Sequence, residues 1–335
     1  MDDHDVPANT APPIRPTVRE ILQTPVSTAV AAASRWVRAK RDARMLPHQD
    51  SVARALSRIA SGESRDGSIK KVVVVVAHPD DEAIGAGMAI RGLPGVTIVH
   101  VTDGAPSDPE YARRRGFESR GDYARARRAE VVAALNVIGV AEDQIRGLGI
   151  VDGEASWQLV ELSRRMMDLF EELKPDVVLT HPYEGGHSDH DSTAFAVHLA
   201  AGLLRRQGAP APLLIELTSY HNYNGRRRLF DFLPFQGTDV KTVRLTPEQQ
   251  EIKRRMFNQF TSQRDLLRTF PVQVERFRQA PRYLFTVPPH EGQLDYERLC
   301  KKMTGAEWRA QAERALETLR TRVHFRTSGT SAGSQ

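Results

Sequence analysis

The segment from Ala77 to Glu82 places one imidazole and three carboxylates directly after a run of valines. The chemistry-bearing residues are His78, Asp80, Asp81 and Glu82. The preceding residues, Val72 to Val76, suit a strand that is covered on both faces, as in a parallel sheet. Sites in open parallel sheets lie beyond the carboxyl ends of strands. We therefore expect this strand end to carry chemistry.

A second polar cluster follows another apolar run, Val177 to Thr180. It extends from His181 to Asp191 and contains His187, Asp189 and His190 within four positions of a glycine-bearing loop. Because the carboxyl ends of parallel strands meet at one edge of a sheet, both clusters are expected in one pocket. His181 lies at the strand end itself, where support of the loop and contact with substrate are equally good interpretations.

Imidazole nitrogens and carboxylate oxygens hold zinc, and catalytic zinc sites use three protein ligands and leave a position for water. His78, an aspartate of the first cluster and His190 supply such a set. Local spacing leaves both Asp80 and Asp81 open as the carboxylate ligand. We take Asp81 as the ligand and Asp80 as the general base. Fe²⁺ or another divalent cation is an alternative to zinc.

Metal-activated water needs a base, and attack of that water on an amide builds an oxyanion that needs a donor. Asp80 is the candidate base and His187 is the candidate stabiliser and general acid. Asp189 is the candidate partner that orients His187 and favours its charged form. The structural alternative is that both clusters are acidic helix starts, with Ser188 to Asp191 forming a capping box.

From residue 70 onward, strand-like and helix-like segments alternate, which predicts an α/β fold: a Rossmann-like, mostly parallel β-sheet with helices on both faces. The expected strands are 72–77, 96–101, 177–180 and 213–218, and the expected helices are 83–91, 122–138, 157–173 and 193–205. Thr246 and Pro247 predict the start of a long helix that continues to about Arg268. A further amphipathic helix is expected at 306–320.

The chain is divided by composition into three parts. Residues 1–66 are expected to form a partly helical N-terminal extension, 67–325 a single α/β domain with its core at 70–268 and a helical C-terminal segment, and 326–335 a disordered tail. No apolar stretch is long enough to cross a bilayer, and the acidic start does not resemble a secretory signal. With the single cysteine Cys300, these features favour a cytoplasmic protein, and a homo-oligomer is compatible with them.

Lys and Arg exceed Asp and Glu by 47 to 42, and the excess is clustered. Arginines crowd the segment 113–128, and Arg226 to Arg228 are consecutive. These clusters are either solvated faces or a basic rim that attracts an anionic substrate. Nucleic-acid binding is not expected, because no aromatic-interleaved basic groove, helix-turn-helix or zinc-finger spacing accompanies the arginines.

At this point the residues resemble the LmbE-like, or PIG-L, family of zinc-dependent N-acetylglucosamine de-N-acetylases. The Ala-His-Pro-Asp-Asp-Glu motif of that family is present as Ala77 to Glu82, and its His-x-Asp-His motif as His187 to His190. The resemblance extends over 70–268. It includes Thr102-Asp103-Gly104 after the second strand, an Arg-x-x-Glu pair at Arg127 and Glu130, and a late helix with Lys253 and Ser262-Gln263. Ala105 and Phe260 depart from the pattern of many relatives, which bears on the substrate pocket.

The resemblance implies zinc on His78, Asp81 and His190, with Asp80 as general base. It implies that His187 is the electrostatic stabiliser and general acid, that Asp189 is its partner, and that Arg127 contacts an amino-sugar substrate. The implied reaction is hydrolysis of an N-acetyl group from a GlcNAc-containing small molecule or glycoconjugate.

Three other functions remain as alternatives. A related amidase would cleave a larger amide of an amino-sugar conjugate. A mononuclear iron oxygenase also uses two histidines and one carboxylate, although an all-β jelly roll is expected for it. A non-catalytic sugar- or nucleotide-binding protein is suggested by Gly85-Ala86-Gly87, a short match that lacks the third glycine of the dinucleotide fingerprint.

Overall fold

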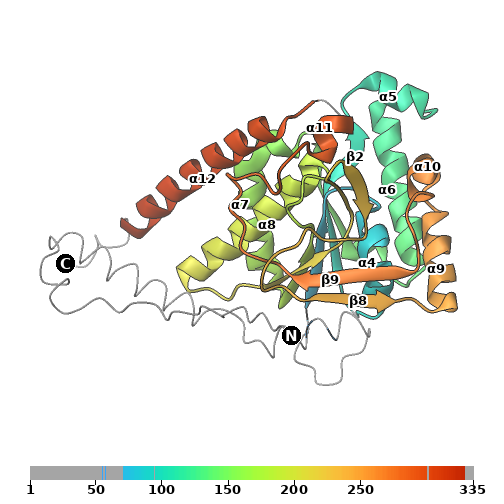
Figure 1. Cartoon of the computed structure of the whole chain (residues 1–335), viewed down its shortest axis with the longest axis horizontal. Coiled ribbons are helices and arrows are strands. Elements are labelled where there is room, and N and C mark those ends of the chain that lie inside the picture. Colours follow the sequence, from blue (N-terminus) through green and yellow to red (C-terminus); the bar gives the residue numbers. More distant parts are fainter. Residues whose placement is uncertain (1–54, 56, 58–70, 94, 300–301, 329–335) are drawn as a thin grey trace, which may run out of the picture. The chain divides into compact units, whose positions relative to one another are not determined.

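The computed structural model describes residues 55, 57, 71–93, 95–299 and 302–328. Its main element is a seven-stranded sheet with the order β3-β2-β1-β4-β5-β9-β8 (Figure 1). Five strands are parallel to one another, and β9 and β8 continue the sheet in antiparallel fashion. The strands are β1 (Val72–Val76), β2 (Thr97–Pro106), β3 (Ile145–Asp152), β4 (Val177–Thr180), β5 (Leu213–Leu217), β8 (Val240–Arg244) and β9 (Val274–Gln279). The prediction of a mostly parallel α/β sheet is confirmed.

The five valines of β1 explain why the sheet needs helices on both sides. Val72, Val74 and Val76 pack into one apolar cluster, and Val73 and Val75 pack into another. Helices α4, α6 and α9 contribute to the first cluster, and α7 and α8 contribute to the second (Figure 1). Successive side chains of a strand point to opposite faces, so each face of β1 is buried under its own helical layer.

The helices and the separate hairpin complete the described chain. The α-helices are α4 (Asp81–Arg91), α5 (Pro109–Arg114), α6 (Arg120–Asn136), α7 (Leu159–Leu173), α8 (Ser188–Gln207), α9 (Pro247–Phe257), α10 (Arg264–Leu267), α11 (Asp295–Leu299) and α12 (Gly305–Ser328). Short 3₁₀ turns are η1 (Glu142–Gln144), η2 (Ala155–Gln158) and η3 (Thr261–Gln263). Strands β6 (Tyr220–Tyr223) and β7 (Arg226–Leu229) form the hairpin.

Two predicted helices differ from the observed ones. The helix that begins after the Thr246 cap ends at Phe257, and the chain then turns through η3 into α10 instead of continuing to Arg268. Hydrogen bonds to α6 stabilise this interruption, because the Glu130 carboxylate accepts from Thr261 and Ser262. Helix α12 runs to Ser328, so residues 326–328 are helical and not part of the expected tail.

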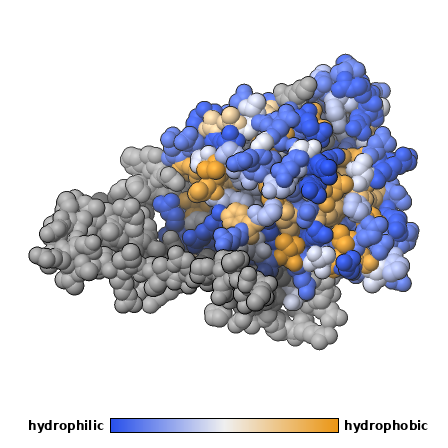
Figure 2. Space-filling model, viewed as in Figure 1, coloured by the Kyte–Doolittle hydropathy of each residue, from blue (hydrophilic) through white to orange (hydrophobic). Residues whose placement is uncertain are grey.

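The expected N-terminal extension, 1–66, lies almost wholly outside the described residues, as do residues 329–335 of the tail. Where the structure describes the chain, no helix combines the length and the apolar character needed to span a bilayer. The surface in view is mainly hydrophilic and carries several separate apolar patches (Figure 2). The predictions of a cytoplasmic location and of a homo-oligomer stay predictions.

Candidate metal centre and active site

The residues after β1 form a tight turn that leads directly into α4. We call residues 77–82 the first loop. The backbone N–H groups of Asp80 and Asp81 both donate to the carbonyl of His78, at 2.9 and 3.2 Å. The His78 N–H in turn donates to the Asp81 carboxylate at 2.8 Å. Helix α4 begins at Asp81, with Asp80 as its N-cap residue. The turn therefore fixes His78, Asp80 and Asp81 relative to one another.

The residues after β4, here called the second loop (181–190), lead into α8 and bring His190 to the same place. His190 Nε2 lies 3.3 Å from His78 Nδ1 and 3.3 Å from Asp81 Oδ1. His78 Nδ1 and Asp81 Oδ2 are 3.2 Å apart. All three side chains are buried. The predicted triad of His78, Asp81 and His190 is thus brought together from two strand ends.

These separations fit one small divalent cation. Two ligand atoms that each lie about 2.0–2.1 Å from a tetrahedral zinc ion are about 3.3–3.4 Å apart, close to the observed spacing. The ionisation states of Asp81 and His190 fit as well, whereas the Asp152, Asp189 and Asp81 carboxylates raise the pKa of His78 above its ordinary value despite burial. Burial opposes ionisation of Asp81, but the imidazoles of His190 and His181 hold its pKa well below its ordinary value. Burial lowers the pKa of His190 to about 4, so its ring is neutral, as a metal ligand must be.

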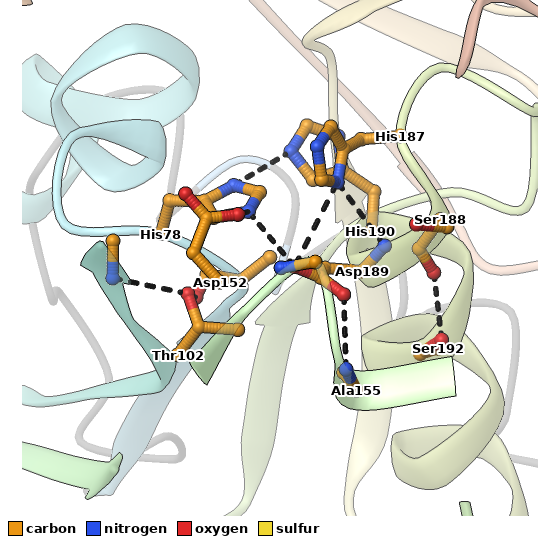
Figure 3. A network of polar contacts seen from close by, with 12 residues as sticks. His78, Thr102, Asp152, Ala155, His187, Ser188, Asp189, His190 and Ser192 are labelled. Atoms are coloured by element: carbon orange, nitrogen blue, oxygen red, sulfur yellow. Dashed lines mark hydrogen bonds and ion pairs between the residues drawn. The ribbon is translucent and has the colours of Figure 1, made fainter. Parts of the chain in front are cut away.

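The far side of the His78 ring faces two further carboxylates. Its Nε2 lies 3.2 Å from Asp189 Oδ2 and 3.3 Å from Asp152 Oδ1 (Figure 3). The Asp189 carboxylate is held by the backbone N–H groups of Gly153, at 2.7 Å, and Ala155, at 3.1 Å. A metal-binding histidine commonly donates its other N–H to a carboxylate, which fixes the ring orientation. Asp189 and Asp152 are placed to do this for His78.

Asp152 is the site residue that the sequence analysis missed. It is the last residue of β3, and its strand was not predicted. Gly147 and Gly149 interrupt the apolar pattern of β3, and only Ile145 and Ile150 are buried within it. The only sequence signal for Asp152 was the short apolar pair of Ile150 and Val151 before it. The first loop shows the same arrangement with a longer apolar run, since its acidic residues follow the valines of β1.

His187 differs from expectation. It is the N-cap residue of α8, and its Nδ1 accepts a hydrogen bond from the Asp189 backbone N–H at 3.2 Å. The Asp189 carboxylate lies 3.8 Å from this nitrogen and makes its shorter contacts elsewhere. Burial and the neighbouring His78 lower the pKa of His187 to about 4 and outweigh the opposite effect of Asp189. The ring is therefore neutral near pH 7, with Nε2 carrying the proton.

Asp80 is paired with Arg127 of α6. Arg127 Nη2 donates to Asp80 Oδ2 at 3.1 Å, and both side chains are buried. Burial raises the pKa of Asp80 to about 6, and Arg127 limits the rise. Gly104 makes room for the guanidinium, because a Cβ at this position would lie 2.6 Å from Arg127 Nε. Within the described residues, Nε and Nη1 of Arg127 have no hydrogen-bond partner.

The remaining motif residues lie around the proposed ligands, and His181 Nε2 is 3.3 Å from Asp81 Oδ2. His181 Nε2 accepts from the Ala77 N–H at 3.0 Å, and its ring stacks on His190 at 3.9 Å, so it supports the loop. Gln263 donates to the Tyr123 hydroxyl. The two departures from the family pattern, Ala105 and Phe260, are fully buried in apolar clusters.

The arginines of the segment 113–128 are mostly paired. Arg113, Arg114, Arg120, Arg125, Arg127 and Arg128 each contact a carboxylate. This arrangement favours the interpretation as a paired helix surface over a free basic rim. Arg226 to Arg228 of β7 are exposed, and Arg227 contacts the Asp295 carboxylate at 3.4 Å.

Comparison with known proteins shows which family this arrangement is similar to. Residues 73–201 match the family described as PIG-L: GlcNAc-PI de-N-acetylase, and the match includes both loops. Over these residues the chain is similar to the PIG-L family. One relative is the 1D-myo-inositol 2-acetamido-2-deoxy-alpha-D-glucopyranoside deacetylase of Salinispora arenicola, 33% identical over 147 residues that cover 36% of this chain and 47% of that protein.

A second PIG-L relative is the probable N-acetyl-alpha-D-glucosaminyl L-malate deacetylase 2 of Bacillus cereus, 26% identical over 153 residues that cover 44% of this chain and 69% of that protein. Among solved structures, the A40926 pseudoaglycone deacetylase has a TM-score of 0.49 and 19% identity, with 64% of this chain and 99% of that chain covered. The chain spans about half the length of the Salinispora relative that it matches.

Two of the alternative functions fit the structure poorly. The parallel α/β sheet is not the all-β jelly roll that we associate with the iron oxygenases. Gly85 and Gly87 lie within α4, whereas the dinucleotide fingerprint requires its glycines in the turn between a strand and a helix.

Proposed function

We propose that the protein is a metal-dependent de-N-acetylase that hydrolyses the N-acetyl amide of a GlcNAc-containing small molecule or glycoconjugate, releasing acetate and a free amine. The observation that carries the proposal is the spacing of 3.2–3.3 Å among His78 Nδ1, the Asp81 carboxylate and His190 Nε2, next to the buried Asp80. The relatives from Salinispora arenicola and Bacillus cereus are named as deacetylases of amino-sugar conjugates, which supports the choice of bond.

Zinc is the proposed metal, with His78, Asp81 and His190 as its ligands. When bound, it would polarise the amide carbonyl and lower the pKa of a water molecule toward 7. Asp189 and Asp152 would hold the His78 ring through Nε2. Fe²⁺ or another divalent cation would satisfy the same donor set.

Asp80 is the proposed general base. A carboxylate with a pKa of about 6 is largely ionised at neutral pH and still accepts a proton readily from the attacking water. The water oxygen bonds to the acetyl carbon, the carbon–nitrogen bond breaks, and the proton that Asp80 took can pass to the departing amine. Arg127 holds the base in place. Contact between its guanidinium and substrate stays a prediction, because Nε and Nη1, which lack partners within the described residues, are buried.

His187 is the proposed stabiliser of the developing oxyanion. Its Nδ1 is occupied as an acceptor, so a neutral ring presents an Nε2–H donor. A single donor of this kind is worth about 3 kcal/mol of transition-state stabilisation. Because its pKa lies near 4, the earlier expectation that protonated His187 supplies the proton to the amine is less well supported than transfer from Asp80.

The test is product analysis with zinc-loaded protein and a panel of N-acetylated amino sugars, followed by mass spectrometry for the free amine and an acetate assay. We expect deacetylation of at least one panel member, loss of activity on chelation, and recovery with zinc. A second panel with bulky acyl groups separates deacetylation from cleavage of a larger amide. Tight binding of an amino sugar by zinc-loaded protein without turnover would contradict the proposal.

A further inference from the structure

Helix α4 is broken one turn after the metal ligand Asp81. Ala86 has φ −147° and ψ 15°, outside the helical range, and is flanked by Gly85 and Gly87. A Cβ on Gly85 would lie 2.4 Å from the Leu217 side chain, so β5 can approach the break only because this residue is glycine. The Gly-x-Gly pair that resembled a nucleotide-binding motif therefore marks an interruption of the helix.

The break frees backbone hydrogen-bonding groups, and one buried ion pair takes them up. The N–H groups of Met88 and Ala89 donate to the two carboxylate oxygens of Glu275, at 2.9 and 3.0 Å. The carbonyl of Ile84 accepts from Lys253 Nζ at 2.8 Å. Lys253 Nζ also donates to Glu275 Oε1 at 2.8 Å, and both side chains are fully buried.

This pair differs from an ordinary buried ion pair. Replacing a buried pair by apolar residues is often neutral, because two desolvated charges disappear together. Here the same replacement would leave two N–H groups and one carbonyl of α4 without partners in a dry core, which is costly. The first turn of α4 also needs contacts from outside the helix, since a single helical turn is unstable in isolation.

The contacts continue from the pair to the first loop. Lys253 holds the carbonyl of Ile84, and the N–H of Ile84 donates to the carbonyl of Asp80 at 2.9 Å. We infer that Lys253 and Glu275 are positioning residues, which hold the separated first turn of α4 so that Asp81 and Asp80 keep their places beside His190. Neither residue is proposed to touch substrate, and the inference depends on the proposed metal site but not on the identity of the substrate.

The test compares zinc affinity, measured by chelator competition, in Lys253→Met, Glu275→Gln and the double variant Lys253→Met/Glu275→Leu. We expect each variant to bind zinc about tenfold or more weakly. Faster amide hydrogen exchange is expected in peptides that cover residues 81–91. At saturating zinc, kcat should fall while KM stays the same, because the pair lies away from substrate.

Phe170→Leu is the matched control, because Phe170 is a buried residue of α7 in the other apolar cluster and its loss of volume destabilises the fold without touching α4. Phe170→Leu should leave zinc affinity unchanged even if it lowers the free energy of unfolding as much as the Lys253 and Glu275 variants do. Wild-type zinc affinity in the double variant, or equal weakening in Phe170→Leu, would overturn the inference. Glu275→Gln, which keeps one acceptor oxygen, supplies the measurement if the lysine variants fail to fold. A wild-type protein that binds zinc but deacetylates nothing would count against the proposed function alone.

Discussion

Replacing Asp80 by asparagine is expected to abolish most turnover and to leave the metal site intact. Asp80 contacts Arg127 at 3.1 Å, whereas the three proposed ligand atoms belong to other residues. An asparagine amide has nearly the same shape but cannot take a proton from water. Since a positioned general base contributes about 10²–10⁴ in rate, kcat should fall by this factor, equivalent to about 3–5 kcal/mol of activation free energy.

The assay measures acetate release and zinc content on the same purified sample. Glu82→Gln is the matched control, because Glu82 is the next buried carboxylate of the same turn but contacts His100 Nε2, at 2.9 Å, and not the metal ligands. It should keep zinc and turnover. Activity of Asp80→Asn within a few-fold of wild type would refute the assignment of the base. Loss of zinc from Asp80→Asn alone would show that the wrong aspartate was chosen as ligand.

Three further predictions address the ligands, the base and the loop. His190→Ala should weaken zinc binding by more than about 100-fold, measured by chelator competition, because one of three ligand atoms is removed. Arg127→Met should move the acid limb of the kcat/KM profile to higher pH, because Arg127 lowers the pKa of Asp80 and only ionised Asp80 is active. Gly186→Ala should destabilise the protein by about 1–3 kcal/mol in urea and reduce its zinc content, because the new Cβ would lie 2.0 Å from the Tyr220 carbonyl oxygen.

Two neighbours on α8 serve as controls. His198→Ala should keep zinc, because His198 is outside the ligand group. Gly202→Ala should be neutral or stabilising by up to about 1 kcal/mol, because nothing lies within 4 Å of the added Cβ and alanine favours the helix. Equal loss of zinc in His190→Ala and His198→Ala would argue against a metal at the triad. An unshifted acid limb in Arg127→Met would show that Asp80 does not set that limb.

The parts of the fold that the sequence predicted are those whose signal is local. The valine run of β1 and the strand at Val177–Thr180 are short apolar segments that end at polar clusters, and both were placed correctly. Strand β3 was missed because Gly147 and Gly149 weaken its apolar pattern. Its burial is decided by pairing with β2, and that pairing depends on residues that are distant in the sequence.

The same distinction holds at the site. The residues of both loops could be chosen because their types and spacing carry the signal. The contact of Asp152 with His78, and the contact of Glu130 with Ser262, join residues 74 and 132 positions apart, and no local pattern indicates them. The sequence could not predict that the pKa of His187 is lowered, because the effect of burying the ring is larger than the opposite effect of the nearby Asp189.

The proposed roles of Asp80 and Asp81, which spacing left open, rest on where the turn points each side chain. Asp81 faces His190 and His181, and these imidazoles keep its pKa well below the ordinary value despite burial. Asp80 faces Arg127, and burial raises its pKa to about 6. Active sites assign different roles to two neighbouring carboxyl groups by placing them in environments that shift their pKa values in opposite directions. The lowered pKa of Asp81 suits a metal ligand, and the pKa of about 6 suits Asp80 to the proposed role of taking and returning a proton.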